Sequence, residues 1–275
     1  MVEHAVHQRR SKIGSAVQIL ELIYHSTVRS VRKSHGNAII GLFVSILQTL
    51  ILVLVFYFMF TILGLRGMTI RGDFLLYILT GIFLFLTHNK AVTSVTSAEG
   101  PASPMMLHAP MNTAISITSS ALASLYIQIL ALAVILFVYH VGFNRITFYE
   151  PAAANGMVLL AWYTGVGVGL LFLALKPWMP GFVSVAQQIY TRANMVASGK
   201  MFVANTLPSS MVALFDWNPL FHCIDQARGY TFINYNPHFS STTYPLVLGL
   251  VLMMIGLMGE FYTRKHVSVS WGAGK

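Results

Sequence analysis

Charged side chains are scarce in this sequence. They make up 9% of 275 residues, and only eight residues are acidic. A soluble domain carries about 25% charged residues, so this scarcity excludes an ordinary water-facing surface. Hydrophobic residues account for 56% of the chain. They form long runs without the alternation of a membrane barrel strand, which predicts an all-α integral membrane protein.

Cysteine and catalytic motifs are also scarce. Cys223 is the single cysteine, which excludes an internal disulfide and a cysteine-rich metal site. A P-loop needs glycine five residues before Gly199-Lys200, but Asn194 stands there. His222 and Asp225 lie near Cys223 but make a poor metal site, and a packed outer helix is the simpler interpretation. The sequence therefore predicts no enzyme, no catalytic residue, and no metal or cofactor held by this chain.

Six stretches lose their charge for about the length that crosses a bilayer. The fifth stretch differs because it contains Arg192 and Lys200. The first follows a long basic segment and is too long for a signal peptide, so we expect an uncleaved span. The six predicted spans are Ala38–Gly64, Phe74–His88, Thr113–His140, Ala152–Leu175, Phe182–Ala204 and Tyr244–Tyr262.

Basic residues predict the orientation of these spans. The formal net charge is +9, and the basic residues crowd near the chain ends, which favours membrane orientation over nucleic-acid binding. With both termini inside, eleven Lys and Arg fall on the cytoplasmic side and four on the other. We therefore expect a cytoplasmic N-terminus over 1–37, a six-span domain over 38–262 and a cytoplasmic tail over 263–275.

Residues 11–35 have the pattern of an amphipathic helix. Apolar residues recur at helical spacing and basic residues gather near the end. Such a helix lies flat at the cytoplasmic membrane interface, or it is a soluble helix packed on a partner. The apolar positions are Ile13, Val17, Leu20, Tyr24, Val28 and Val31.

Two connections between spans have their own patterns. A short helix is expected over Asn89–Ala98, ended by Gly100 and Pro101; it serves either as contact for a soluble partner or as a plain connector. The segment 206–243 is unusually apolar, which predicts two short helices in the outer leaflet or over a cavity. Asn218 is expected to cap the second, with Pro219 first and a surface pair of Asp225 and Arg228.

The two charges of the fifth span suggest a passage. A charge inside a span costs on the order of 3 kcal/mol, so it persists where it faces a bundle interior or water. Eight residues at about 100° each place Arg192 and Lys200 broadly on one side of a helix, lining a path for an anionic or hydroxyl-rich cargo. Alternatively Lys200 snorkels and Arg192 pairs with a carbonyl. Gly165, Gly167 and Gly169 predict close helix approach, within the subunit or between subunits.

The order of these parts resembles the permease subunits of polysaccharide-exporting ABC transporters, among them capsule and O-antigen exporters. The local match runs from Ser198 to Arg228, although Lys200 departs from the family's usual apolar residue. The matching residues are Ser198, Gly199, Phe202, Leu207, Pro208, Trp217, Asn218, Pro219, Leu220, His222, Ile224 and Arg228.

The resemblance implies a homodimer around a conduit, in the bacterial inner membrane, with two copies of a separate ATPase that holds ATP and Mg. The ATPase would receive a coupling helix over about 88–100, and gate helices over about 207–231 would stand at the periplasmic mouth. It assigns the coupling to His88, Asn89, Lys90 and Glu99. It assigns the conduit to Tyr190, Arg192, Lys200 and Phe202. It assigns the gate to Pro208, Trp217, Asn218, Pro219, Phe221, His222, Asp225 and Arg228.

The sequence thus favours an ATP-driven exporter of a lipid-linked capsular or similar polysaccharide, with periplasmic or outer-membrane export proteins as further partners and no nucleic acid. One rival is a drug or lipid exporter of the same architecture. A second is a membrane-embedded enzyme acting on lipid-linked sugars, which the scarcity of paired acidic or histidine residues disfavours. A secondary transporter is weaker still, because no inverted repeat is visible.

Overall fold

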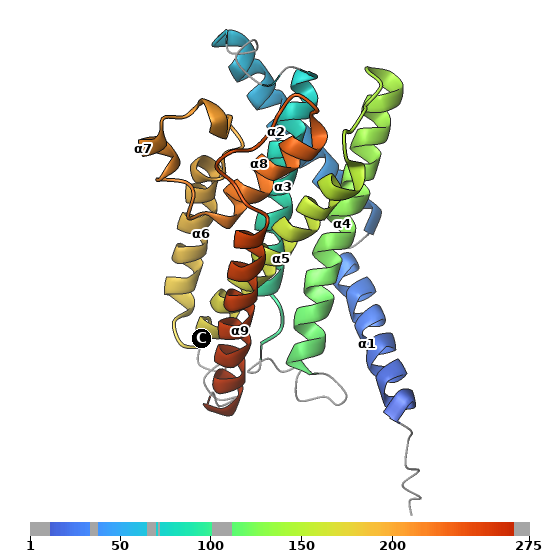
Figure 1. Ribbon diagram of the computed structural model, residues 1–275. Coiled ribbons are helices and arrows are strands. Elements are labelled where there is room, and N and C mark those ends of the chain that lie inside the picture. Colours follow the sequence, from blue (N-terminus) through green and yellow to red (C-terminus); the bar gives the residue numbers. More distant parts are fainter. Residues whose placement is uncertain (1–11, 34–37, 65–69, 71, 101–111, 267–275) are drawn as a thin grey trace, which may run out of the picture.

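The computed structural model describes residues 12–33, 38–64, 70, 72–100 and 112–266, and all its regular elements in these ranges are helical. Figure 1 shows long helices running lengthwise and shorter helices toward one end. The helices are α1 (Lys12–Lys33), α2 (Ala38–Ile62), α3 (Phe74–Thr96), α4 (Thr113–Gly142), α5 (Pro151–Leu175), α6 (Pro180–Ala197), α7 (Ser209–Val212), α8 (Pro219–Thr231) and α9 (Thr243–His266).

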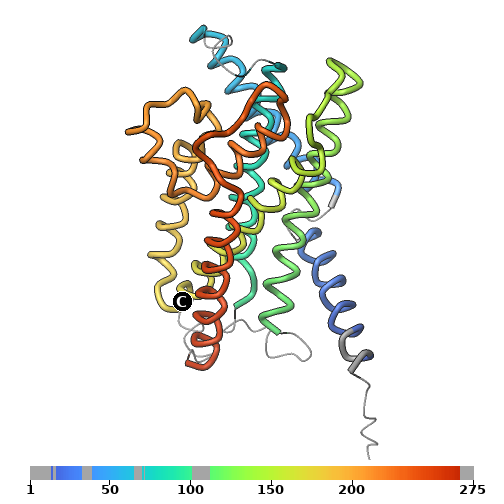
Figure 2. The backbone as a smooth tube through the Cα atoms, in the orientation of Figure 1, coloured from blue at the N-terminus to red at the C-terminus, as the bar shows by residue number. Residues whose placement is uncertain are grey.

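Five of these helices, α2, α3, α4, α5 and α9, are long and apolar enough to cross a bilayer. This confirms an all-α, multi-pass membrane protein. The fifth predicted span corresponds to α6, which has 18 residues and carries Arg192, Gln187 and Gln188, and it does not reach the same apolarity. Following the chain in Figure 2, α3 and α5 descend, α4 and α6 rise, and α9 descends again.

Helix α3 is the centre of the bundle. It is buried along most of its length, whereas α2 and α9 keep large apolar side chains such as Phe58 and Met258 exposed, as expected for faces turned to lipid. Asp73 caps α3: its carboxylate accepts from the backbone N–H groups of Leu75 at 2.9 Å and Leu76 at 3.4 Å. Asp73 also accepts from the Tyr139 hydroxyl of α4, which joins the two helices.

Glycines bring α5 close to both neighbours. A Cβ on Gly165 would lie 2.5 Å from the His88 carbonyl oxygen, and one on Gly169 would lie 2.8 Å from the Val95 Cβ, both on α3. A Cβ on Gly167 would lie 3.0 Å from the Leu252 Cβ on α9. The predicted close approach is confirmed inside the subunit, because only hydrogen fits at these contacts.

The predicted boundary between the second span and a separate coupling helix is wrong. Helix α3 continues without a break from Phe74 to Thr96, and Ser97 follows as its cap. At the end of α3 the Lys176 Nζ donates to the Thr96 carbonyl at 3.1 Å. This bond satisfies one of the carbonyls that a helix end leaves without an intrahelical partner. The prolines Pro101, Pro104 and Pro110 lie outside the described residues.

Helix α1 confirms the predicted helix over 11–35 to within two residues at each end. It packs against α4, with Val31 buried. Val17, Leu20 and Tyr24 keep about two thirds of their side-chain surface exposed, at 58%, 65% and 65%. The apolar stripe is therefore covered only toward its C-terminal end, and the partner of the remainder stays a prediction.

Candidate functional site

Figure 1 shows α7 and α8 at the end of the bundle where α9 begins; we call this the α8 end. Helix α8 packs against α5, α3 and α9. It starts as predicted, with Pro219 first and the Asn218 side chain accepting from the Leu220 N–H at 3.0 Å. The Asn218 Nδ2 donates to the Asn194 Oδ1 at 2.8 Å and to the Ala197 carbonyl at 3.1 Å, so one side chain ties α8 to the end of α6.

Arg228 anchors α8 to the turn after α6. Its side chain is 1% exposed, and its guanidinium donates to the carbonyls of Gly199 at 2.9 Å, Lys200 at 2.8 Å and Phe202 at 2.6 Å. The guanidinium carbon lies 4.2 Å from the centre of the Tyr77 ring on α3. The two terminal nitrogens thus hold three carbonyls beside a ring face, whereas the Nε has no hydrogen-bond partner among the described residues.

Asp225 has different partners, which overturns the predicted Asp225–Arg228 surface pair. Asp225 is 2% exposed, and its carboxylate accepts from the hydroxyls of Tyr235 and Ser240, the latter at 2.6 Å. Burial, reinforced by the Asp225 charge, raises the pKa of Tyr235. Both residues face the protein interior and bond to tertiary partners there instead of to each other.

His222 is fixed by two backbone groups. Its Nδ1 accepts from the Ser241 N–H at 3.0 Å, so its Nε2 carries the proton and donates to the Asp216 carbonyl at 2.6 Å. Burial lowers the pKa of His222. The neighbouring Cys223 is fully buried. No group of three His, Cys, Asp or Glu side chains suited to a metal occurs in the described ranges.

The other predicted gate residues lie around α7. The predicted first outer helix is the single turn α7, which Pro208 precedes. Trp217 is exposed, its indole N–H donates to the Leu214 carbonyl at 2.7 Å, and its own carbonyl accepts from the Tyr244 hydroxyl at 2.7 Å. Phe221 is buried against Gly199. The two helices are present, and their role as a gate stays a prediction.

The predicted placement of Lys200 in a helix beside Arg192 is wrong. Helix α6 ends at Ala197, and Gly199 adopts the left-handed φ of +75°, which turns the chain away. Lys200 is 3% exposed, with its Nζ 3.5 Å from the centre of the Phe85 ring and 5.1 Å from that of Phe56. Arg192 is exposed on α6. The two charges therefore do not share a helix face.

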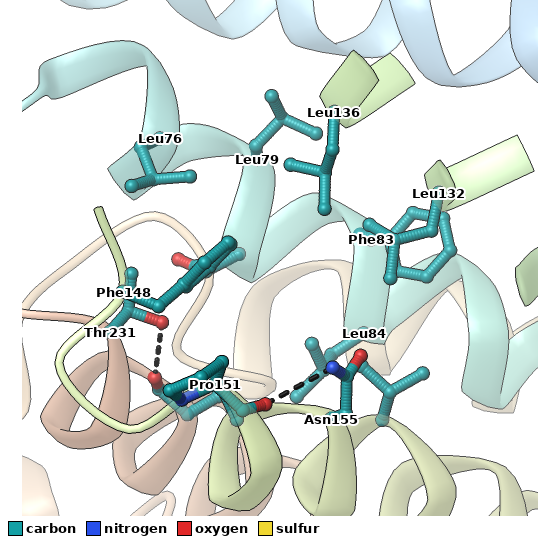
Figure 3. A pocket seen from close by; sticks show the side chains of 14 residues that line it. Leu76, Leu79, Phe83, Leu84, Leu132, Leu136, Phe148, Pro151, Asn155 and Thr231 are labelled. Atoms are coloured by element: carbon teal, nitrogen blue, oxygen red, sulfur yellow. Dashed lines mark hydrogen bonds between the residues drawn. The ribbon is translucent and has the colours of Figure 1, made fainter. Parts of the chain in front are cut away.

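The remaining predicted conduit residues have separate surroundings. The Tyr190 hydroxyl lies 2.8 Å from the His88 Nε2, and the Phe202 ring lies 4.9 Å from that of Phe215. The role of the four residues as a conduit stays a prediction. A small apolar cavity of about 100 Å³ lies elsewhere, between α3, α4, α5 and α8. Figure 3 shows the side chains that line it, among them Leu79, Phe83 and Leu136.

Two of the four predicted coupling residues are buried inside the bundle. His88 is 0% exposed, and its Nδ1 lies 3.0 Å from the Ala161 carbonyl and 3.1 Å from the Thr164 hydroxyl. Asn89 donates to the Phe85 carbonyl at 2.9 Å. This corrects their placement in a separate coupling helix, because α3 continues past them and packs on α5. Lys90 and Glu99 are half-buried and line a polar cavity.

That cavity was missed by the sequence reasoning. It has a volume of about 530 Å³ and lies between α1, α2, α3 and α4, toward the end away from α8. Its α4 wall contains Ser116, Ser120, Ser124 and Gln128, which are spaced four residues apart and so follow one helix face. This polar stripe within an apolar span is a signal that the sequence does contain.

Compared with known proteins, the chain matches no family model and no curated protein.

Proposed function

We propose that this protein is the membrane permease subunit of an ATP-driven exporter, and that its cargo is a lipid-linked capsular or similar polysaccharide. The observation that supports this most is the attachment of α8. A short helix that does not span is seated in the bundle and tied by Asn218 and Arg228 to the end of α6. A non-spanning helix at one mouth of a bundle suits a gate that moves with its neighbouring span.

The proposal includes α6 as a sixth span. Its 18 residues cover about 27 Å at 1.5 Å per residue, close to the thickness of the hydrocarbon core. In Figure 1 it runs lengthwise between the end of α5 and the α8 end. Six spans put both termini on one side, which agrees with the excess of basic residues in the segments assigned to the cytoplasm.

In this proposal two copies of the chain pair around the conduit, and each copy binds one ATPase subunit that supplies ATP hydrolysis. The contact is assigned to the last turn of α3 and the residues after it. Thr93 and Ser97 are exposed there, and Glu99 is half-buried. His88 and Asn89 are not included in this contact, because they are buried and cannot reach a soluble partner without unpacking α3 from α5.

The test begins with a strain that lacks this chain. It is expected to lose its surface polysaccharide and to regain it with the wild-type gene. The chain is then purified with the P-loop ATPase encoded beside it. Ser97→Arg is expected to abolish co-purification and ATPase stimulation, whereas Ser210→Arg, an equally bulky change at an exposed residue of α7, retains both.

Three results would contradict the proposal in different ways. If disruptive changes throughout 93–99 leave the complex and its ATPase stimulation intact, the coupling assignment is wrong. A null strain that keeps its polysaccharide and becomes drug-sensitive would favour a drug exporter. Turnover of a lipid-linked sugar by the purified chain without any ATPase would favour the membrane enzyme.

A further inference from the structure

The 530 Å³ cavity between α1, α2, α3 and α4 is lined mainly by hydroxyl groups. Nine serines and one threonine contribute to its wall. Its volume lies within the range of about 300–1,000 Å³ that is typical of small-molecule sites. We call it the Gln128 cavity. A polar cavity of this size is unexpected between helices whose other faces are apolar, because polar groups inside a span are costly unless they have partners.

Four hydroxyls of this wall, those of Ser94, Ser97, Ser119 and Ser124, already donate their hydrogen to backbone carbonyls. The Ser94 hydroxyl donates to the Ser120 carbonyl at 2.7 Å, and the Ser124 hydroxyl donates to the Ala121 carbonyl at 2.7 Å. The Ser119 hydroxyl donates to the Ser116 carbonyl at 3.0 Å. Because each hydroxyl has a single hydrogen, these oxygens keep only lone pairs for a further partner. A ligand that fits them must bring its own donors.

The side-chain oxygen of Gln128 also lacks a hydrogen-bond donor in the described part of the chain. Its side chain is 2% exposed and lines the cavity, yet its Oε1 has no hydrogen-bond partner among the described residues. A buried amide oxygen without a donor is destabilising, and native proteins rarely leave one so. A hydroxyl donor that reaches this oxygen would satisfy it.

Two cations line the same cavity, Arg29 from α1 and Lys90 from α3. In the part of the chain that the structure describes, neither lies within ion-pair distance of a carboxylate. Glu99 also lines the cavity, so the wall carries one net positive charge. Arg29 and Arg32 line an adjoining open hollow on α1, which makes the approach basic as well. Arg and Lys side chains are the usual partners of phosphate oxygens.

We propose that the Gln128 cavity binds an anionic phosphodiester or phosphomonoester that carries free hydroxyl groups. The phosphate lies at Lys90 and Arg29, and the hydroxyls donate to Gln128 and to the serine oxygens. The ligand comes from one of two sources, the headgroup of a membrane lipid or a soluble sugar or glycerol phosphate. The inference concerns binding by this chain alone and holds whether or not an ATPase partner exists.

The test uses the purified full chain in a neutral detergent, stripped of lipid. Three probes are titrated: short-chain phosphatidylglycerol, glycerol 3-phosphate and short-chain phosphatidylcholine. The first two combine a phosphate with hydroxyls, and the third is a zwitterionic phosphodiester with no hydroxyl donor. Binding is measured by fluorescence and by the shift in melting temperature. At least one hydroxyl-bearing probe is expected to bind ten times more tightly than phosphatidylcholine.

Lys90→Gln and Gln128→Leu are each expected to weaken this binding about tenfold. Gln128→Leu should leave the ligand-free protein at least as stable as the wild type, since it removes the unpartnered amide. Arg145→Gln is the control, because it removes one exposed positive charge beyond the end of α4 that lies away from the cavity, and should bind as the wild type does. If Gln128→Leu does not fold, Lys90→Gln alone decides the question.

The outcomes separate the two sources. Tight binding of phosphatidylglycerol alone assigns a lipid headgroup, and binding of glycerol 3-phosphate assigns a soluble ligand. Equal affinity for phosphatidylcholine, or equal affinities of the Lys90→Gln and Arg145→Gln variants, overturns the inference, as does no binding of any probe. Because no ATPase or transport is measured, these results leave the proposed export function to its own test.

Discussion

Arg228 donates to the Gly199 carbonyl, 29 residues before it in the chain, rather than to the Asp225 carboxylate one helical turn away. Arg228 is the only fully buried arginine of the described residues, and its guanidinium contacts the turn that follows α6. A guanidinium that holds three carbonyls fixes the path of that turn. We therefore expect the stability of the α8 end to depend on Arg228.

Replacing Arg228 by Gln is expected to lower the free energy of unfolding by about 3 kcal/mol, because three carbonyls lose a charged donor. Thermal unfolding of the purified protein in detergent measures the change. Arg192→Gln is the matched control, since Arg192 is exposed, and should stay within about 0.5 kcal/mol of the wild type. Equal melting temperatures for the two variants would contradict the anchoring role.

Two glycines of α5 are expected to respond with opposite sign to the same substitution. Gly165→Ala places a Cβ 2.5 Å from the His88 carbonyl oxygen and should destabilise by about 1–3 kcal/mol. Gly156→Ala meets nothing within 4 Å and should stabilise, because alanine favours a helix by about 1 kcal/mol over glycine. Melting temperatures of the two variants check this. Destabilisation of both by a similar amount would show that α3 and α5 do not approach so closely.

His222 makes the α8 end sensitive to acid. Burial lowers its pKa in the folded protein below the ordinary 6.5, so below about pH 6.5 the unfolded chain takes up a proton that the folded one resists. Stability from this group is present above pH 6.5 and is lost as the pH falls through the folded value.

Melting temperatures between pH 7.5 and 5.5 measure this effect. The wild type should lose stability over the range, and His222→Gln should lose less. The exposed His238 offers the comparison, since His238→Gln should follow the wild type. Identical pH profiles for all three proteins would exclude His222 as the titrating group.

Single cysteines test whether α6 crosses the membrane. Native Cys223 is fully buried and burial raises its pKa, so it should not react in the folded protein. Met179→Cys precedes α6 and Leu214→Cys follows it, and both positions are exposed. An impermeant maleimide should label Leu214→Cys in intact cells and Met179→Cys only after permeabilisation. Labelling of both from the same side would exclude α6 as a span.

The sequence was sufficient for the elements that depend on local properties. Long stretches without charged residues predicted α2, α3, α4, α5 and α9. The Asn218-Pro219 pair predicted the start of α8. These signals act within one helix or one cap, where burial and hydrogen bonding are set by neighbours in sequence.

The tertiary partners of the buried polar residues could not be predicted from the sequence. The contacts of Arg228, His88 and Asp225 join residues between 10 and 102 positions apart, and no local pattern selects one such partner over another. Lys200 was misplaced because Gly199 ends the helical path one residue before it. The Gln128 cavity needs four helices to meet, so only its α4 stripe was visible in the sequence.

Lys176, whose ammonium group ends α3 at Thr96, has a mechanical consequence together with Asn218. The loop that carries Lys176 leads directly into α6, and the far end of α6 is fastened to α8 by Asn218. Side-chain hydrogen bonds thus hold the chain near both ends of α6. We therefore expect a displacement of the last turn of α3 to be transmitted along α6 to α8, about 27 Å away.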